Sequence, residues 1–212
     1  MSSPESRVAR LESTLVLASA SLRRQELLRN AGISFAAQAA DIDETPLADE
    51  KAEQFARRLA REKALAIARL RPRDRVLGAD TIVVVDGAIL GKPRDADDAA
   101  RMLRMLSGRT HHVITGVCVI EAVVSGQGPV ASGAAIRIAS GTTLVTMNPL
   151  SEEDIREYVA TGEPMDKAGA YAIQGMASRW IPRIEGDYSN VVGLPVALVY
   201  KMLRDSARSQ AQ

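Results

Sequence analysis

The sequence predicts a mixed β-sheet flanked by helices, in an α/β or α+β fold. Segments with strand character are intermixed with segments of helical periodicity, and at least two pairs of strands have the spacing of hairpins. The 212 residues are 46% hydrophobic and 25% charged. A chain of this size and composition forms one compact domain, or two closely packed lobes, around a sizeable core.

The chain begins with a predicted strand, turn and helix. The apolar run Leu15–Ala18 leads into a serine-containing turn, and the helix that follows stops at Gly32, a residue that favours the C-terminal end of a helix. A short second strand is expected within Ile33–Ala39. Apolar residues then recur at helical spacing over Leu47–Leu70, which predicts a long helix.

The middle of the chain predicts a β-hairpin. Val76–Val85 is an apolar, β-branched run, and Asp86-Gly87 after it is a strong turn signal. Ala88–Leu90 should therefore return antiparallel to the first strand. A helix capped by Asp95 is expected next, over Ala96–Leu106.

Two long strands are expected after this helix. They cover His111–Glu121 and about Ala134–Met147, and the Gly- and Ser-rich segment 123–133 between them has the composition of a loose hairpin tip. Ser151 with the acidic residue three positions later resembles a capping box, which predicts a helix over Glu152–Ala160.

The domain boundaries are expected near both ends of the chain. Residues 1–14 are predicted to be a flexible N-terminal extension, residues 15–205 a single domain, and residues 206–212 a frayed tail. Within the domain, Pro195 opens a final helix that runs to about Leu203.

The composition argues against nucleic acid and membrane partners. Basic residues number 27 and acidic residues 26, so the net charge is +1, and only 3% of residues are aromatic. No apolar run approaches the roughly 20 residues that span a bilayer, and residues 1–14 do not resemble a secretory signal. The single cysteine, Cys118, excludes an intrachain disulfide. We expect a cytoplasmic enzyme or binding domain.

The first turn has the features of an anion site. Ser19 and Ser21 lie where a strand meets the start of a helix, so backbone N–H groups and the positive end of the helix dipole point outward there. Arg23 and Arg24 add positive charge suited to phosphate oxygens. The alternative is a capped amphipathic helix with two solvated arginines.

Acidic residues form a second group of candidates. Asp80 lies inside an apolar strand, where an unpartnered carboxylate is costly, so we interpret it as a metal ligand or general base at a strand end. The alternative is an aspartate satisfied by a neighbouring turn. Asp43 and Glu44 form an acidic pair in a loop; they are either solvated, or join Asp80 in a site for Mg²⁺.

Two lysines and one amide complete the candidates. Lys63 lies on a helix crowded with arginines, so a solvated face is its default and a phosphate contact the alternative. Lys92 follows the hairpin on a rigid bend and is the stronger phosphate candidate. Gln174 lies in a glycine-rich loop, where its amide suits the edge of a nucleobase, although a surface loop with packing glycines explains the same residues.

Several common sites are not indicated. His111 and His112 are adjacent and face opposite sides of a strand, so a zinc site is improbable. The sequence contains neither a P-loop nor a Rossmann fingerprint, and it has no nucleophile elbow.

Taken together, these motifs resemble the Maf family of nucleotide pyrophosphatases. The matching motifs, in the order of that family and across nearly the whole chain, are Ser19-x-Ser21-x-Arg23-Arg24-x-x-Leu27-Leu28, Asp43-Glu44, Lys63, Gly78-Ala79-Asp80-Thr81, Gly91-Lys92-Pro93, Ser107-Gly108, Thr115-Gly116, Asp166-Lys167-Ala168-Gly169, Ile173-Gln174-Gly175 and Asn190-Val191-Val192-Gly193-Leu194-Pro195. Each motif is weak alone, but jointly they are specific.

The resemblance implies a fold and an activity. The fold would be α/β, of the Maf and inosine-triphosphatase type, with two lobes around a cleft. The activity would be hydrolysis of a nucleoside triphosphate to the monophosphate and pyrophosphate with a divalent metal, Mg²⁺ or Mn²⁺. A homodimer is a further expectation from the family.

The resemblance also implies residue roles. Asp80 would be the general base that activates water. The positions associated with substrate choice are Arg23, Thr81 and Gln174. The residues that would bind phosphate or metal are Ser19, Arg24, Lys63 and Lys92, with Asp43, Glu44 and Asp80 as the metal ligands.

The motifs also resemble one branch of the family more than another. Thr81 and Gln174 resemble the residues at these positions in the branch that acts on dTTP and UTP. Modified pyrimidine nucleotides would be further substrates. A branch that prefers 7-methyl-GTP has a glutamine and a glutamate there, which makes physical sense because a methylated guanine is cationic. That activity is one alternative, and a non-catalytic nucleotide-binding regulator of septum formation is another. The tip at 123–133 and the N-terminus are longer than expected for the family.

Overall fold

The structure is a computed structural model that describes residues 14–121 and 135–209. The proposed hairpin tip at 123–133 and nearly all of the proposed N-terminal extension lie outside the described residues. Within them, one mixed sheet has the order β2-β1-β3-β5-β6-β7, with β4 paired to β3. Its strands are β1 Leu15–Leu17, β2 Ala36–Ala37, β3 Arg75–Val85, β4 Ala88–Leu90, β5 Thr110–Ile120, β6 Ile136–Thr146 and β7 Arg183–Glu185.

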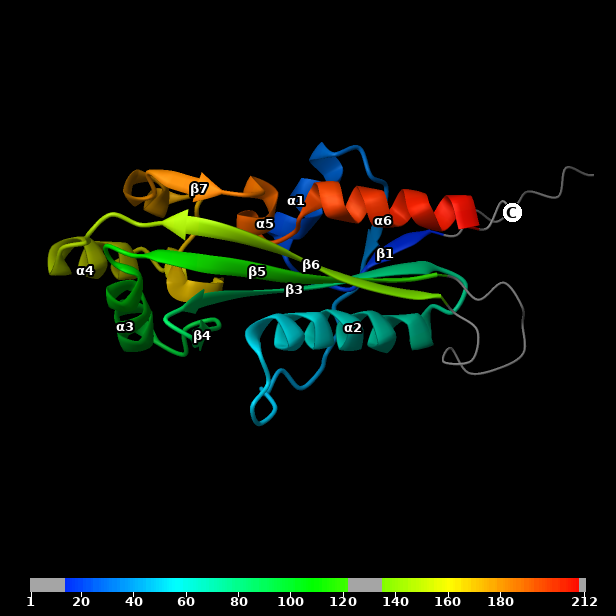
Figure 1. The fold of residues 1–212 in the computed structure, drawn as a ribbon, viewed down its shortest axis with the longest axis horizontal. Helices are drawn as coiled ribbons and strands as arrows, with labels where there is room; N and C mark the ends of the chain where they lie inside the picture. Colours follow the sequence, from blue (N-terminus) through cyan, green and yellow to red (C-terminus); the bar gives the residue numbers. More distant parts are fainter. Residues whose placement is uncertain (1–13, 122–134, 210–212) are drawn as a thin grey trace, which may run out of the picture.

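Helices flank this sheet on both faces (Figure 1). The α-helices are α1 Leu22–Asn30, α2 Ala52–Leu70, α3 Ala96–Leu106, α4 Glu152–Ala160, α5 Tyr188–Val192 and α6 Val196–Ser209. Three short 3₁₀ helices, η2 Glu163–Asp166, η3 Ala168–Ala170 and η4 Met176–Trp180, fill the segment after α4. The prediction of a mixed α/β sheet flanked by helices is therefore confirmed.

Strand directions divide the sheet into two parts. β1 is parallel to both of its neighbours, β2 and β3. In the rest of the sheet, each neighbouring pair is antiparallel: β3 with β5, β5 with β6, and β6 with β7. The hairpin of β3 and β4 forms at Asp86-Gly87, as the turn signal predicted. The parallel pairs place the turn after β1 beside the middle of β3, where Asp80 lies.

Helix α2 lies unusually close to the sheet. A Cβ added at Gly78 of β3 would stand 2.1 Å from the carbonyl oxygen of Ala60, and one added at Gly116 of β5 would stand 2.2 Å from that of Ala56. Only glycine allows the helix backbone to approach the strands this far. The close contact brings Lys63, on the next turn of α2, over Asp80.

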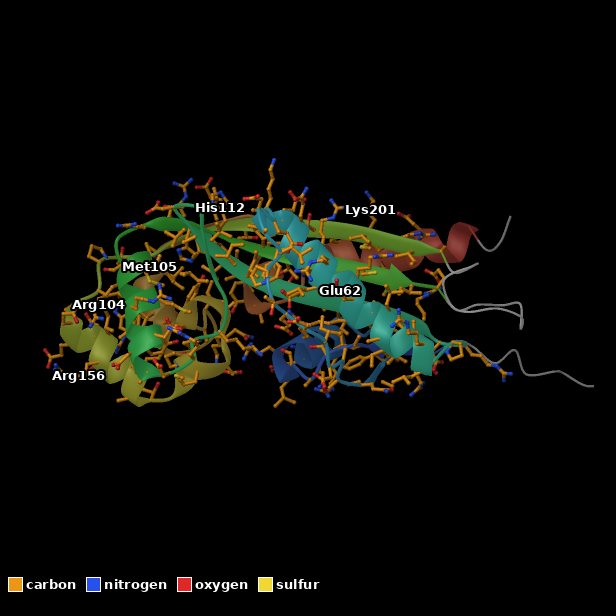
Figure 2. The ribbon with its side chains drawn as sticks, turned by 90° about the horizontal axis from the view of Figure 1, so that it is seen from below. Glu62, Arg104, Met105, His112, Arg156 and Lys201 are labelled. Carbon is orange, nitrogen blue, oxygen red and sulfur yellow. The ribbon has the colours of Figure 1, made fainter. Side chains whose placement is uncertain are left out.

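Among the described residues, the buried side chains form four clusters; two of them lie at opposite ends of the sheet, and the other two lie between α2 and the sheet. Around α3 and α4, Leu103, Met147 and Tyr158 are buried together, while Leu17 and Leu28 pack near α1 and α6 at the other end. Figure 2 shows the same division: α2, with Glu62, crosses the long strands, while α3 and α4 form a separate group at one end. The molecule therefore has two lobes joined by the long strands β3, β5 and β6.

Two helix boundaries differ from the prediction. α2 begins at Ala52 rather than near Leu47, because a tight turn with Asp49 at a φ of 58° precedes it. α6 continues to Ser209, past the predicted end at about Leu203. The sequence after Leu203 contains neither Gly nor Pro to stop the helix. Among the described helices, none has the length and apolar character needed to cross a membrane.

Candidate functional site

A cavity of about 780 Å³ lies between the two lobes. It is bordered by the β1–α1 turn, the middle of β3, the bend after β4 and the segment around the 3₁₀ helices. Its polar and charged lining residues are Ser19, Ser21, Arg23, Arg24, Glu44, Lys63, Asp80, Thr81, Lys92, Asp166, Lys167 and Gln174. Every residue predicted for the site lines this cavity except Asp43.

The β1–α1 turn combines both interpretations of its sequence. The Ser21 hydroxyl accepts from the backbone N–H of Arg24 at 3.4 Å and so caps α1, as the structural alternative held. The Ser19 hydroxyl instead accepts from the Arg24 side chain, with Nη1 at 3.2 Å, and faces the cavity. Both serines line the cavity, but only the Ser21 hydroxyl caps the helix.

Arg24 is held in place on three sides. Its Nε donates to the carbonyl oxygen of Gly193 at 2.8 Å, and its Nη2 donates to the Thr81 hydroxyl at 3.0 Å. Thr81 also lies 2.9 Å from the hydroxyl of Thr115 on β5. Burial lowers the pKa of Arg24 from its usual value, while the nearby Asp80 carboxylate opposes that shift. The result is a fixed cation at the cavity wall rather than a solvated arginine.

Asp80 is buried and forms an ion pair with Lys63. The Lys63 ammonium lies 2.5 Å from Asp80 Oδ1 and 2.7 Å from Glu44 Oε1. Lys63 is only 9% exposed, so its default interpretation as part of a solvated helix face is wrong. Because α2 packs so closely on β3, its inward-facing lysine meets the strand carboxylate.

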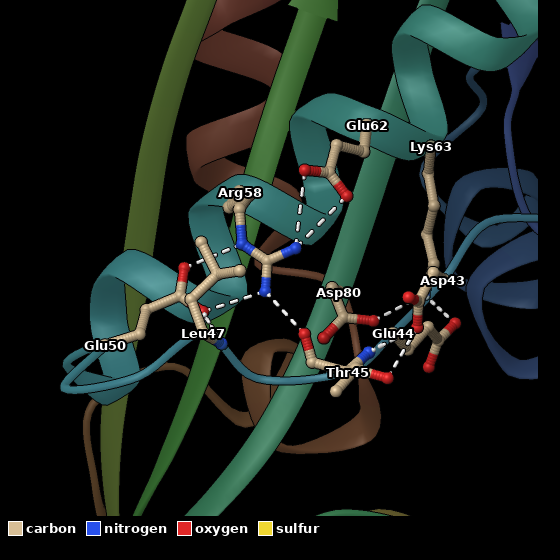
Figure 3. A network of polar contacts seen from close by, with 9 residues as sticks. All are labelled: Asp43, Glu44, Thr45, Leu47, Glu50, Arg58, Glu62, Lys63 and Asp80. Atoms are coloured by element: carbon tan, nitrogen blue, oxygen red, sulfur yellow. Dashed lines mark hydrogen bonds and ion pairs between the residues drawn. The ribbon is translucent and has the colours of Figure 1, made fainter.

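Glu44 and Asp43 are adjacent but do different things (Figure 3). Glu44 lines the cavity and contacts Lys63. Asp43 accepts from the Thr45 hydroxyl at 2.6 Å and from the Thr45 N–H at 2.9 Å, and the hydroxyl contact lowers the pKa of Asp43. Asp43 therefore closes a local turn in the loop.

An arginine that the sequence analysis did not single out anchors this loop. Arg58 on α2 donates Nη2 to the carbonyl oxygen of Thr45 at 3.0 Å and Nε to Glu50 at 2.7 Å (Figure 3). The Glu50 side chain is 8% exposed and that of Arg58 20%. In the sequence, the only local sign of this role was that Glu62 follows Arg58 by four residues. Such a spacing is common on exposed helix faces and so does not single out Arg58.

The carboxylates near Asp80 fit a divalent metal whose remaining coordination positions are filled by phosphate oxygens of a bound ligand and by water. Asp80 and Glu44 converge on a single cation, the Lys63 ammonium. Mg²⁺ commonly takes one or two carboxylates and completes its shell with phosphate oxygens and water. Among the described residues, no three His, Cys, Asp or Glu side chains gather into a metal site, so Asp43 does not complete a triad with the other two.

A second ion-pair network in the cavity lining joins α1 to η2. Arg23 Nη1 donates to Asp166 Oδ2 at 2.7 Å, and Lys167 Nζ donates to Asp166 Oδ1 at 2.5 Å. Burial alone would raise the pKa of Asp166, but the hydrogen bonds from Lys167 and Arg23 outweigh it and lower this pKa to about 2. Asp166 and Lys167 belong to a motif noted in the sequence. The sequence analysis gave them no role, because their partner Arg23 is far away in the chain.

Lys92 and Gln174 are the open polar groups of the lining. Among the described residues, neither side chain forms a hydrogen bond or an ion pair. They can therefore meet a ligand without breaking a contact in the protein. The arrangement offers cations on several walls, the buried carboxylate of Asp80 beside the exposed carboxylate of Glu44, and one amide, which together suit a polyanionic ligand with a heterocyclic group.

The chain is similar in sequence to a family of known proteins. The family model described as Maf-like protein matches residues 14–206. A dTTP/UTP pyrophosphatase of Koribacter versatilis is 55% identical over 90% of this chain and 93% of its own length. Those of Geobacter metallireducens and Salmonella typhimurium are each 50% identical, covering 91% and 90% of this chain and 95% and 92% of their own lengths. A solved HAM1 protein from Coxiella burnetii aligns with a TM-score of 0.41 and 21% identity, over 64% of this chain and 73% of that one.

Proposed function

Because this chain belongs to the Maf family, we propose that it is a nucleoside triphosphate pyrophosphatase that hydrolyses dTTP and UTP. The products are the nucleoside monophosphate and pyrophosphate, and modified pyrimidine nucleotides are included as substrates. The observation that carries the proposal is the convergence of Asp80, Lys63 and Arg24 on one cavity, in a chain half identical to proteins with that name.

Asp80 is the proposed general base. Its carboxylate takes a proton from water as the water oxygen forms a bond to the α-phosphorus. The bond between that phosphorus and the oxygen bridging to the β-phosphate breaks, and pyrophosphate leaves with the bond's electron pair. Lys63, paired with Asp80, holds the carboxylate in place and stabilises its negative charge.

The cations of the cavity are the proposed triphosphate contacts. Arg24 is fixed by Gly193 and Thr81, so it presents its charge without reorganising. Lys92 and the Ser19 hydroxyl border the same cavity. Negative charge that develops on the leaving pyrophosphate is stabilised by groups of this kind.

Asp80 and Glu44 are the proposed holders of a divalent metal, Mg²⁺ or Mn²⁺. Such an ion, when bound, neutralises phosphate charge and polarises the phosphorus–oxygen bonds. Asp43 was predicted as a third ligand; its contacts with Thr45 favour a role in shaping the loop instead.

Base selection is assigned to the other side of the cavity. The neutral amide of Gln174 both donates and accepts, which matches the edge of thymine or uracil. A cationic 7-methylguanine would favour a carboxylate at this position, so 7-methyl-GTP is the less suitable substrate. Arg23 also lines the cavity, and Thr81 acts through its contact with Arg24.

A nucleotide panel tests the proposal directly. The purified protein is incubated with each triphosphate and Mg²⁺ or Mn²⁺, and pyrophosphate is measured as phosphate after addition of inorganic pyrophosphatase. Turnover of dTTP and UTP above purine nucleotides supports the proposal, and the absence of any pyrimidine turnover overturns it. Tight nucleotide binding without turnover would identify a non-catalytic regulator instead.

Two further expectations belong to the same proposal. A homodimer is expected from the family resemblance, and analytical ultracentrifugation tests it. A cytoplasmic location follows from substrates that are nucleotides of the cellular pool, and fractionation of cells tests it.

A further inference from the structure

We propose that Tyr158 and Glu163 are positioning residues for Gln174, and that together they fix the loop 172–176 against the cavity. The inference rests on the proposed function in one respect: it takes Gln174 to be the group that reads the base. Neither Tyr158 nor Glu163 lines the cavity, so both would act through the loop.

Hydrogen bonds hold this loop on both sides of Gln174. The backbone N–H of Ala172 donates to the Tyr158 hydroxyl at 3.0 Å. The backbone N–H of Met176 donates to the Glu163 carboxylate, with Oε1 at 3.2 Å and Oε2 at 3.3 Å. The two anchored residues are each two positions from Gln174, so the loop can deviate little between them.

The two anchors are also joined to each other. The Tyr158 hydroxyl donates to Glu163 Oε1 at 2.7 Å, which closes a ring of hydrogen bonds from Ala172 to Met176. Tyr158 is fully buried and packs edge-on against Trp180, with ring centroids 5.4 Å apart. Burial raises the pKa of Tyr158, so its hydroxyl keeps its proton and remains a donor to Glu163 at neutral pH.

The loop rests directly on the carboxylate. A Cβ added at Gly175 would stand 2.3 Å from Glu163 Oε1, well inside contact distance. The residue after Gln174 is therefore a glycine for a steric reason, because a Cβ there would displace the Glu163 carboxylate from its position under the loop. This contact, together with the two backbone hydrogen bonds, accounts for the position of the loop.

The 3₁₀ helix η2, which carries Glu163, also contacts Arg23, another residue expected to select the substrate. Glu163 and Asp166 are the first and last residues of η2, and Asp166 accepts from Arg23. Lys167 Nζ donates both to the Glu163 carbonyl oxygen at 2.7 Å and to Asp166. One short helix thus sets the positions of Gln174 and Arg23 relative to each other.

The first test compares Tyr158→Phe with Tyr200→Phe, a matched control on the exposed surface of α6. Hydrogen–deuterium exchange is measured on the free protein. In Tyr158→Phe, the peptide amides over 172–176 should exchange about tenfold faster than in the wild type, as the loss of an anchoring hydrogen bond allows. The control should leave them unchanged. Unchanged exchange in Tyr158→Phe overturns the proposal, whatever the substrate proves to be.

The second test separates positioning from stability with two changes at one residue. Glu163→Gln keeps an oxygen able to accept from Tyr158 and Met176, whereas Glu163→Ala removes both contacts. We expect the ratio of kcat/KM for dTTP over dGTP to fall about tenfold in Glu163→Ala, mainly through KM for dTTP, and to be largely restored in Glu163→Gln. Equal ratios in all three proteins, with only the melting temperature reduced, would contradict the inference.

The two tests also distinguish this inference from the proposed function. If the wild type hydrolyses no pyrimidine triphosphate, the proposed function fails, and hydrogen–deuterium exchange alone still decides whether Tyr158 and Glu163 fix the loop. If dTTP is hydrolysed but loop exchange is insensitive to both residues, the function stands and the inference fails.

Discussion

Lys63 Nζ lies 2.5 Å from Asp80 Oδ1 in the interior of the cavity wall, and the same nitrogen lies 2.7 Å from Glu44. One ammonium group thus satisfies two carboxylates that come from a strand and a loop. The pairing explains how Asp80 is tolerated in an apolar strand, because a buried carboxylate requires a partner. It also places the cation and the carboxylates where phosphate oxygens would enter.

Replacement of Asp80 by asparagine should remove most turnover while nucleotide binding persists. The amide has nearly the same shape but cannot take a proton from water, and loss of a general base typically costs roughly 10²- to 10⁴-fold in rate. Pyrophosphate release gives kcat, and isothermal titration gives the nucleotide Kd. Unchanged kcat would remove Asp80 from the role of base.

Replacement of Gln174 by glutamate should weaken the use of dTTP. The carboxylate accepts hydrogen bonds but no longer donates one, so the fall in kcat/KM for dTTP should be about tenfold or more, as expected for an unmatched polar contact. Steady-state kinetics with dTTP and 7-methyl-GTP measure the change. If dTTP kinetics stay the same, Gln174 does not contact the base.

Replacement of Arg58 by alanine should loosen the loop that carries Glu44. Arg58 ties Thr45 and Glu50 to α2, so its loss leaves Glu50 without its charged partner and costs roughly 1–3 kcal/mol of stability. We expect a higher Mg²⁺ concentration for half-maximal activity and faster proteolysis within the loop.

Arg57→Ala provides the control for this experiment. Arg57 is the neighbouring residue on α2, and its contact with Glu53 at 3.8 Å is solvent-exposed. It should leave both the Mg²⁺ dependence and the proteolysis pattern unchanged. Identical behaviour of the two variants would show that Arg58 does not position the loop.

The stability of the fold should decline in mild acid because of His111. Burial lowers the pKa of His111 from 6.5 to about 4, so between these values the unfolded chain binds a proton that the folded protein does not. The contribution of the neutral His111 to the free energy of unfolding is therefore fully present above about pH 6.5. It is lost as the pH drops toward 4, which lowers the free energy of unfolding by up to about 3 kcal/mol.

Urea unfolding at several pH values checks this dependence. His111→Gln should flatten the curve between pH 4 and 6.5, whereas His112→Gln, on the exposed side of the same strand, should not. A curve with the same slope in His111→Gln would assign the acid sensitivity to other groups.

Much of the fold follows from local sequence signals. The turn at Asp86-Gly87 and the capping box at Ser151 lie where they were expected, because turn and cap preferences depend on neighbouring residues alone. The bounds of α3 and α4 also agree with the prediction, whereas the start of α2 and the end of α6 do not. The late start of α2 follows from the tight turn at Asp49, and Glu50 beside that turn is held by Arg58, eight residues further along the chain.

The sequence by itself determined which residue types were available for phosphate chemistry: the serines and arginines of the first turn, a carboxylate in an apolar strand, and an amide among glycines. Only the tertiary structure decided which of them meet. Asp43 and Glu44 are neighbours in the chain, yet one closes a turn with Thr45 and the other contacts Lys63. Lys63 itself is buried because Gly78 admits α2 to the sheet. Such contacts join distant segments, and their energy depends on packing that no local pattern encodes.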